Sequence, residues 1–201
     1  MLRKLPIVGV FGSGHALDAR RARLAHDVGA MIAGLGTHLL TGAGYGIMAA
    51  AAEGFVSVAD RVGWSIGIVP RMSDGPFDEP NRDPDGRAYP NPFVEIAIHT
   101  PLPPNAEQWR ATPARNHVNV LSSHAIVALP GGIGTRNELD MAAEYRNQGN
   151  LAPGDRRTIL VGPAEEFSAE HRAIFAHAAT VADAERHVRR VIAKFGPPKT
   201  S

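Results

Sequence analysis

The sequence predicts an α/β fold in which helices cover both faces of a doubly wound, mostly parallel β-sheet. Short apolar runs alternate with amphipathic segments along the chain, and the runs are almost continuously apolar. Such runs are typical of parallel strands that are buried on both sides. Three of them end in a glycine-rich turn, as is common in Rossmann-like folds. We expect six strands, at residues 7–11, 38–41, 65–69, 93–98, 125–129 and 158–161.

The helices are predicted from the spacing of apolar and small residues between these strands. A first helix is indicated by apolar residues that recur three or four positions apart, at Leu24, Val28, Met31, Ile32 and Leu35. A second helix is expected at residues 46–59, which are rich in alanine on every face. Such small side chains suit close packing against the sheet or against another subunit. We therefore expect a homodimer or a larger homo-oligomer.

The end of the chain predicts a last helix followed by a tail. Apolar residues at helical spacing mark residues 181–195, and Gly196-Pro197-Pro198 ends the pattern. A chain of 201 residues with 44% hydrophobic residues suits one domain with a sizeable core. We expect this single domain to span residues 1–196 and the flexible tail to span residues 197–201.

Residues 73–92 interrupt the alternation of strands and helices. They are dense in Pro, Asp, Gly and Asn and show no apolar period, so they predict a loop that is longer than the usual connection. A loop of this kind closes over a ligand as a lid or is a passive insertion. The sequence leaves both interpretations open.

The composition excludes several classes of partner and chemistry. A net charge of +1 gives no general attraction for nucleic acid, and no apolar run approaches the ~20 residues that cross a bilayer. We therefore expect a cytoplasmic protein with neither a nucleic-acid nor a membrane partner. There is no cysteine, and the nine histidines lack the spacing of metal ligands, so no metal is expected.

The lysines are informative because they stand only at the two ends of the chain, at Lys4, Lys194 and Lys199. A pyridoxal phosphate enzyme needs a buried lysine, and a Walker loop needs Gly-Lys-Ser/Thr. Neither can be built here, and we expect no bound cofactor. Arginine must supply the cationic chemistry.

Residues 129–138 carry the strongest signal for a ligand. Gly131, Gly132 and Gly134 follow an apolar run and precede a helix that is expected to start near Thr135. Glycines let the main chain approach a ligand closely, and the start of a helix favours an anion through its N–H groups and its dipole. This third glycine turn, residues 131–134, predicts a phosphate site.

Two earlier glycine turns also follow apolar runs. The first glycine turn is Gly12-Ser13-Gly14, and the second is residues 42–46, which include Gly44 and Gly46. Because the carboxyl ends of parallel strands share one edge of the sheet, the three turns are expected to converge. The first turn lacks the last glycine of the dinucleotide fingerprint, and no acidic residue ends the second strand. A dinucleotide ligand is therefore disfavoured.

Glu138 and Arg115 are the candidate reactive residues. Thr135 and Glu138 also match a capping box, in which the glutamate binds the N–H of the cap residue, so a structural role stays open. In the functional interpretation, the Glu138 carboxylate lies near the sugar that carries the phosphate. Arg115 follows Thr112-Pro113-Ala114, and a cation in the first turn of a helix opposes the dipole unless an anion compensates.

These residues resemble the LONELY GUY (LOG) and "possible lysine decarboxylase" proteins, within a wider group that includes molybdenum cofactor carrier proteins. The resemblance covers residues 7 to about 148. Its hallmark, Pro-Gly-Gly-x-Gly-Thr-x-x-Glu, stands at residues 130–138, and the arginine that precedes it stands at Arg115. Residues 8–13 and 41–48 resemble the first two glycine turns of these proteins.

The resemblance implies a nucleoside 5′-monophosphate as ligand and, in LOG proteins, hydrolysis of its N-glycosidic bond to a base and ribose 5-phosphate. It implies catalytic roles for Arg115 and Glu138, with the phosphate held by Gly12, Ser13, Gly44, Gly46, Gly131, Gly132, Gly134 and Thr135. The lysine decarboxylase label fails on the missing lysines.

The chain departs from the LOG pattern next to the arginine. LOG proteins usually follow it with lysine, whereas Asn116 stands here, and residues 112–114 are Thr-Pro-Ala rather than Met-x-Glu. In this respect the chain looks closer to the cofactor carriers. Three hypotheses follow: a phosphoribohydrolase, a carrier that binds a nucleotide or a molybdopterin-like phosphate in the same pocket, and a structural or regulatory subunit with an empty pocket.

Overall fold

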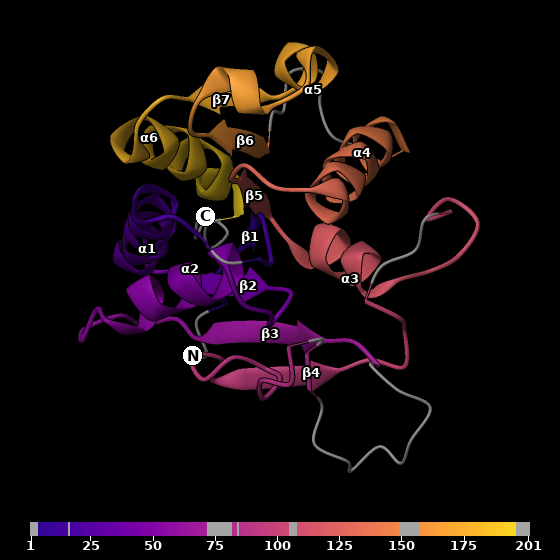
Figure 1. Cartoon of the computed structure of the whole chain (residues 1–201). Helices are drawn as coiled ribbons and strands as arrows, with labels where there is room; N and C mark the ends of the chain where they lie inside the picture. Colours follow the sequence, from indigo (N-terminus) through magenta and orange to yellow (C-terminus); the bar gives the residue numbers. More distant parts are fainter. Residues whose placement is uncertain are drawn as a thin grey trace.

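The computed structural model describes residues 4–15, 17–71, 82–83, 85–104, 108–148 and 157–195. Within these residues, seven strands form one sheet in the order β4-β3-β2-β1-β5-β6-β7, and every neighbouring pair is parallel (Figure 1). This confirms the α/β, doubly wound, Rossmann-like fold, with an all-parallel sheet where a mostly parallel one is predicted. The strands are β1 (Ile7–Phe11), β2 (His38–Thr41), β3 (Ser65–Val69), β4 (Ile96–His99), β5 (Ala125–Ala128), β6 (Thr158–Val161) and β7 (Ala176–Ala178).

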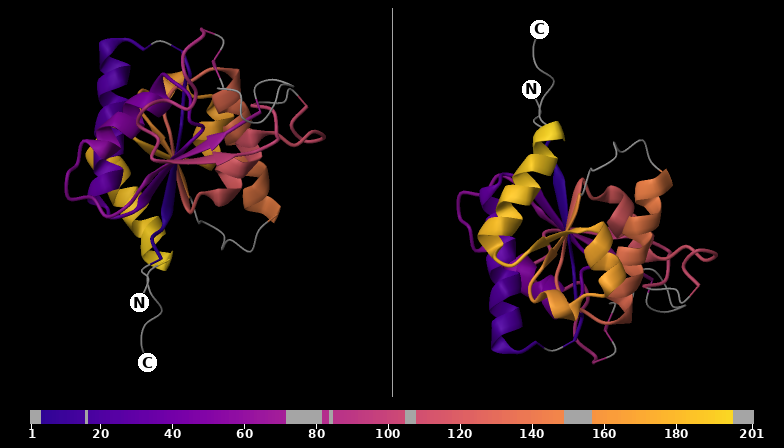
Figure 2. Two further views of the ribbon diagram at one scale, coloured as in Figure 1. Left: turned by 90° about the horizontal axis from the view of Figure 1, so that it is seen from below. Right: turned by 90° about the horizontal axis from the view of Figure 1, so that it is seen from above.

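Helices cover both faces of the sheet, which explains why the central strands are almost continuously apolar (Figure 2). The edge strand β4 is exposed at all four residues. One face packs on α1 (Ala19–Gly34), α2 (Ile47–Val56) and α6 (Val181–Ile192). The other packs on α3 (Arg115–Ser122) and α4 (Ile133–Gln148), and α5 (Ala169–Ile174) contacts α4. Side chains of one strand alternate between the two cores: Val8 and Val10 face α1 and α2, and Phe11 faces α3 and α4. Short 3₁₀ helices are η1 (Ala164–Glu166) and η2 (Ala193–Phe195).

The small residues of α2 serve packing within the chain. A Cβ on Gly29 of α1 would lie 1.9 Å from the carbonyl oxygen of Ala51, and one on Gly54 of α2 would lie 1.9 Å from that of His26. The backbones of α1 and α2 are therefore in direct contact, and any larger side chain at these two glycines would separate them. This contact accounts for the alanine-rich helix without a second subunit, so the homo-oligomer stays a prediction.

Two parts of the predicted order differ from the structure. The fourth strand begins at Ile96, three residues after the predicted start at Phe93, because the N–H of Phe93 binds the Asn91 side chain and that of Val94 binds the Asn91 carbonyl. A seventh strand and α5 follow β6, where only a last helix is predicted. The three residues of β7 are too few to show a strand pattern, and exposed His177 stands in the middle.

The three glycine turns leave the sheet at one edge. They follow β1, β2 and β5, which are adjacent strands, and the order of the sheet reverses between β1 and β5. Ligands of open α/β sheets bind outside the carboxyl ends of the strands at such a reversal. Within the described residues, no helix is long and apolar enough to cross a membrane, and no group of three His, Cys, Asp or Glu side chains could hold a metal ion.

Candidate functional site

A cavity of about 210 Å³ opens at this edge of the sheet, on the side of α3 and α4. Its wall combines the first and third glycine turns with the starts of α3 and α4. It is smaller than the roughly 300–1,000 Å³ of pockets that enclose drug-sized ligands, so it suits the phosphate-bearing part of a ligand. The lining residues are Gly12, Ser13, Gly14, His15, Met48, Pro104, Arg115, Asn116, Gly132, Ile133, Gly134, Thr135 and Glu138.

The third glycine turn presents main chain to the cavity. Arg136 is bound through its N–H to the carbonyl of Gly132 at 3.1 Å, and the N–H groups that precede it in α4 have no partner within the helix. A Cβ on Gly132 would meet no described atom within 4 Å. The main chain at Gly132 is thus open to a ligand, and the first turn of α4 supplies the N–H donors that an anion needs.

Thr135 lies inside α4, which begins at Ile133, so it is not the cap residue of this helix. A Cβ on Gly131 would lie 2.1 Å from the Thr135 hydroxyl oxygen, so Gly131 packs behind the turn. The carboxyl of Glu138 binds Asn119 of α3. The structure therefore does not contain the Thr135–Glu138 capping box, and the structural role considered for Glu138 is wrong.

Arg115 is the first residue of α3, and its side chain reaches across the edge of the sheet to the end of β2. The residue is only 8% exposed, and its Nη1 donates to the carbonyl of Gly42. A Cβ on Gly42 would lie 1.6 Å from Nη1, so only glycine leaves room for the guanidinium. Its Nε is buried without a hydrogen-bond partner among the described residues. An anionic ligand would supply the charge that is missing around this buried cation.

Glu138 lies one turn into α4 and is 8% exposed. Its Oε1 accepts a hydrogen bond of 3.1 Å from Nδ2 of Asn119. Burial raises the pKa of Glu138 from 4.5 to about 7, against the opposing effects of the Arg115 charge and the Asn119 hydrogen bond. The Arg115 and Glu138 side chains both line the same cavity.

The predicted residues divide into lining and supporting positions. The wall of the cavity includes Arg115 and Glu138 together with Gly12, Ser13, Gly132, Gly134 and Thr135. Gly131, Gly44 and Gly46 stand behind this wall. Gly46 has a φ of 64°, and a Cβ there would lie 2.3 Å from the carbonyl oxygen of Ser13, while one on Gly44 would meet Met48 at 2.7 Å. The second glycine turn therefore supports the first one.

Asn119 was not predicted from the sequence. It is fully buried and lies one helical turn after Arg115, so the spacing of four residues within α3 is the signal that could have found it. Asn116 also lines the cavity and is 3% exposed, and its Oδ1 has no partner in the described structure. Its amide is therefore available to a hydroxyl or amino group of a ligand.

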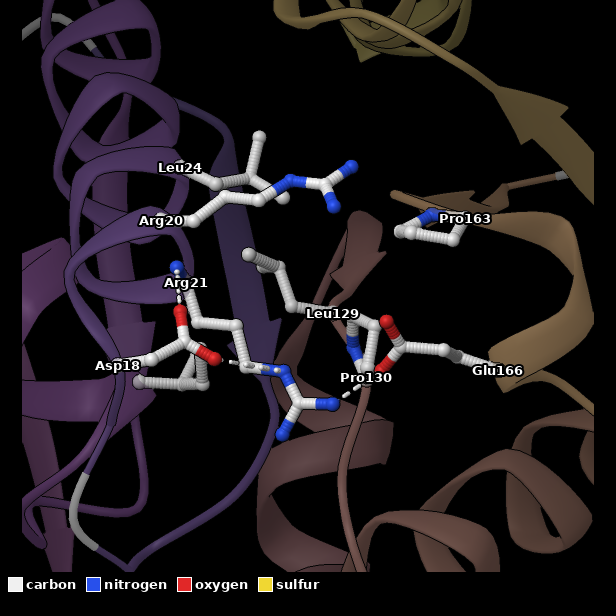
Figure 3. A pocket seen from close by; sticks show the side chains of 9 residues that line it. Asp18, Arg20, Arg21, Leu24, Leu129, Pro130, Pro163 and Glu166 are labelled. Atoms are coloured by element: carbon white, nitrogen blue, oxygen red, sulfur yellow. Dashed lines mark hydrogen bonds and ion pairs between the residues drawn. The ribbon is translucent and has the colours of Figure 1, made fainter.

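A smaller hollow of about 100 Å³ lies on the α1 side of the same sheet edge (Figure 3). Its charged side chains largely pair with one another. Arg21 binds Glu166 at 2.5 Å and lies 3.8 Å from Asp18, so it bridges the start of α1 and η1. The Arg20 side chain extends across the hollow toward Pro163 (Figure 3). Because two carboxylates stand beside the two arginines, this hollow attracts an anion less than the cavity does.

A family model described as the SLOG cluster4 family matches residues 5–178. The cytokinin riboside 5′-monophosphate phosphoribohydrolase of Mycobacterium tuberculosis is 29% identical over 165 residues, which are 80% of this chain and 72% of that protein.

Two solved structures are similar over nearly the whole chain. The Moco carrier protein of Chlamydomonas reinhardtii is 28% identical with a TM-score of 0.68, over 95% of this chain and 99% of that one. The molybdenum cofactor binding protein of Rippkaea orientalis is 28% identical with a TM-score of 0.66, over 94% of this chain and 98% of that one.

Proposed function

Because this chain belongs to the SLOG cluster4 family, a LOG-like family, we propose that it is a phosphoribohydrolase that releases the base from nucleoside 5′-monophosphates. The proposal adopts the class of reaction in the name of the Mycobacterium tuberculosis relative, and it does not specify a cytokinin as the base that is released. The cavity is lined by a glycine turn at the start of a helix, a buried arginine and a buried carboxyl. These are the groups that hydrolysis of an N-glycosidic bond needs.

The burial of the Glu138 carboxyl in the wall of this cavity is the observation that carries this proposal. A pKa of about 7 lets this carboxyl gain and lose a proton at neutral pH, as a catalytic acid or base must. A protein that only binds a phosphate has no use for this group, because a buried carboxylate disfavours a nearby anion. A titrating carboxyl beside an anion site therefore favours an enzyme.

The proposed reaction assigns one task to each part of the cavity. The N–H groups of the third glycine turn and of the start of α4 hold the 5′-phosphate, and the Arg115 guanidinium neutralises its charge. A water attacks C1′ of the ribose as the C1′–N bond breaks, and the electron pair of that bond leaves with the base. The Glu138 carboxylate stabilises the positive charge that develops on the ribose and accepts a proton from the water. The base takes up a proton from solvent.

A carrier that binds a phosphate-bearing ligand is the second candidate. Asn116 supports it, because this cavity holds a neutral amide beside Arg115 where LOG proteins usually have lysine. The carrier and binding proteins with similar structures also span nearly their full length in the comparison. A carrier would use the same glycine turns and Arg115, but it would leave the ligand intact.

The test is incubation with AMP, GMP, CMP and UMP, followed by chromatography of the free bases. We expect the wild type to release base from at least one of them and Glu138→Gln to be slower by ~100-fold or more. Arg115→Ala should lose both affinity and rate. Glu144→Gln, on the same helix but outside the cavity, is the matched control and should keep the wild-type rate. Binding of a nucleotide without any base release would favour the carrier.

A further inference from the structure

The described end of the long segment between β3 and β4 lies against the second glycine turn. The N–H of Asn91 donates to the carbonyl of Ala43 at 2.9 Å, and its Nδ2 donates to the carbonyls of Ala43 and Gly44 at 3.1 and 2.8 Å. Asn91 is 1% exposed. Ala43 has a φ of 64°, which residues with a side chain rarely adopt. Asn91 therefore stabilises an unfavourable backbone conformation next to Gly42.

Tyr89 extends this contact to Arg115. Its hydroxyl donates to the carbonyl of Gly42, the same carbonyl that accepts Nη1 of Arg115. Burial raises the pKa of Tyr89, and the charge and hydrogen bond of Arg115 oppose this rise. The phenol is therefore protonated at neutral pH and keeps its donor. A guanidinium, a phenol and one main-chain carbonyl form a single hydrogen-bonded group.

This group lies directly behind the cavity. Arg115 lines the cavity, whereas Tyr89 and Gly42 do not, so any effect of Tyr89 on a ligand must pass through Arg115 or the turn. An arginine side chain has many rotamers, and fixing it before the ligand arrives reduces the entropy that binding costs. Gly42 supplies this restraint from the second glycine turn. Tyr89 supplies it from the segment before β4, which Asn91 binds to the same turn.

We propose that Tyr89 is a positioning residue that holds the Arg115 guanidinium toward the ligand cavity, so that the segment before β4 is part of the site and not a passive insertion. The ligand itself rests on the proposed function, but the restraint on Arg115 exists without it. The predicted loop at residues 73–92 thus contributes to the site through Tyr89 and Asn91 near its end. Residues 72–81 and 84 lie outside the described structure.

The first test needs no ligand. In a ¹H–¹⁵N spectrum of the arginine Nε–H groups, the signal of Arg115 is identified by its loss in Arg115→Lys. We expect this buried Nε–H to exchange slowly with water in the wild type and at least about fivefold faster in Tyr89→Phe, which removes only the hydroxyl. An Arg115 signal with unchanged shift and exchange rate in Tyr89→Phe would overturn the proposal.

Tyr45→Phe is the matched control. Tyr45 also loses a hydroxyl hydrogen bond to this segment, the 2.8 Å bond to the carbonyl of Ala88, but it does not contact Gly42 or Arg115 through it. The Arg115 signal should therefore be the same in Tyr45→Phe as in the wild type. An equal change in both variants would mean that the segment only stabilises the fold, and would overturn the specific role of Tyr89.

The second test uses AMP and inorganic phosphate as probes in calorimetric titrations. Tyr89→Phe should weaken AMP binding by about two- to tenfold, as expected for one hydrogen bond. In the Arg115→Lys background the same change should have less than about a twofold effect, because Tyr89 acts through Arg115. Equal losses in both backgrounds would contradict the proposal. Binding of AMP without base release from any of AMP, GMP, CMP and UMP would contradict the hydrolase and leave the positioning role standing. If neither probe binds, the spectrum decides.

Discussion

Replacing Glu138 by glutamine should stabilise the protein at pH 8 while it slows base release by ~100-fold or more. Glutamine keeps the shape of the side chain and an oxygen that can accept the Asn119 hydrogen bond. It removes only the charge, which burial makes unfavourable. A residue that serves the fold would show the opposite result, so this substitution separates a functional carboxyl from a structural one.

The magnitude follows from the raised pKa of Glu138. Below pH 4.5 the carboxyl is protonated in both the folded and the unfolded chain, and the substitution has no electrostatic effect. As the pH rises from 4.5 to about 7, the unfolded chain loses this proton first, so the folded state loses stability. At about 1.4 kcal/mol per pH unit, the loss above pH 7 is on the order of 3 kcal/mol. Glu138→Gln should recover this amount, which corresponds to a Tm higher by roughly 6–12 °C.

The assay is thermal unfolding of the wild type and the variant at pH 5 and pH 8. The two proteins should differ by less than about 1 kcal/mol at pH 5 and by about 3 kcal/mol at pH 8. Glu144→Gln, a partly exposed glutamate of the same helix, should change stability by less than about 1 kcal/mol at both pH values. A Glu138→Gln variant that is less stable than the wild type at pH 8 would refute the reasoning.

Four other substitutions test the site. The kcat/KM for base release should rise about tenfold per pH unit up to about pH 7 and then level off, because the Glu138 carboxylate is the active form. Asn119→Ala should move the midpoint of this profile to higher pH, since the Asn119 hydrogen bond lowers the pKa of Glu138. An unmoved midpoint would contradict the assignment. Gly132→Ala should unfold like the wild type in thermal unfolding and bind AMP at least about tenfold more weakly in calorimetry. Gly131→Ala should lose about 1–3 kcal/mol of stability, because its Cβ would lie 2.1 Å from the Thr135 hydroxyl. If the turn did not face the ligand, Gly131→Ala would weaken binding and Gly132→Ala would lower stability. Arg21→Ala should cost less than about 1 kcal/mol and leave base release unchanged, because Arg21 is 44% exposed; a lost activity would place the smaller hollow in the site.

The fold was predictable because its signals are local. Strands such as β1 and β5 are buried on both faces, so their apolar runs alone identify them, and the glycine turn after each one marks its carboxyl end. The strand β7 escaped prediction because three residues carry no periodicity. The late start of β4 depends on the Asn91 side chain, which binds the N–H of Phe93, and such a bond between a side chain and the main chain is not visible as a pattern of hydrophobicity.

The candidate site was predictable from the residues alone only where its parts are contiguous in the sequence. The third glycine turn and the start of α4 are contiguous in the sequence, and the resemblance supplied Arg115 and Glu138 as partners. Asn119 donates a hydrogen bond to Glu138 from another helix. Tyr89 acts on Arg115 from the segment before β4, whereas Arg115 begins the helix after β4. Their roles arise from tertiary packing. The assigned tasks of Arg115 and Glu138 stay predictions until they are measured.

The most direct test of the proposed function is a single-turnover experiment. The protein is mixed with an equimolar amount of AMP, GMP, CMP and UMP in turn, denatured after an interval, and the bound and released species are separated. A phosphoribohydrolase yields base and ribose 5-phosphate in equal amounts from at least one nucleotide, and Glu138→Gln yields neither. Recovery of every nucleotide intact, from a protein that binds at least one of them, would contradict the account and identify a carrier.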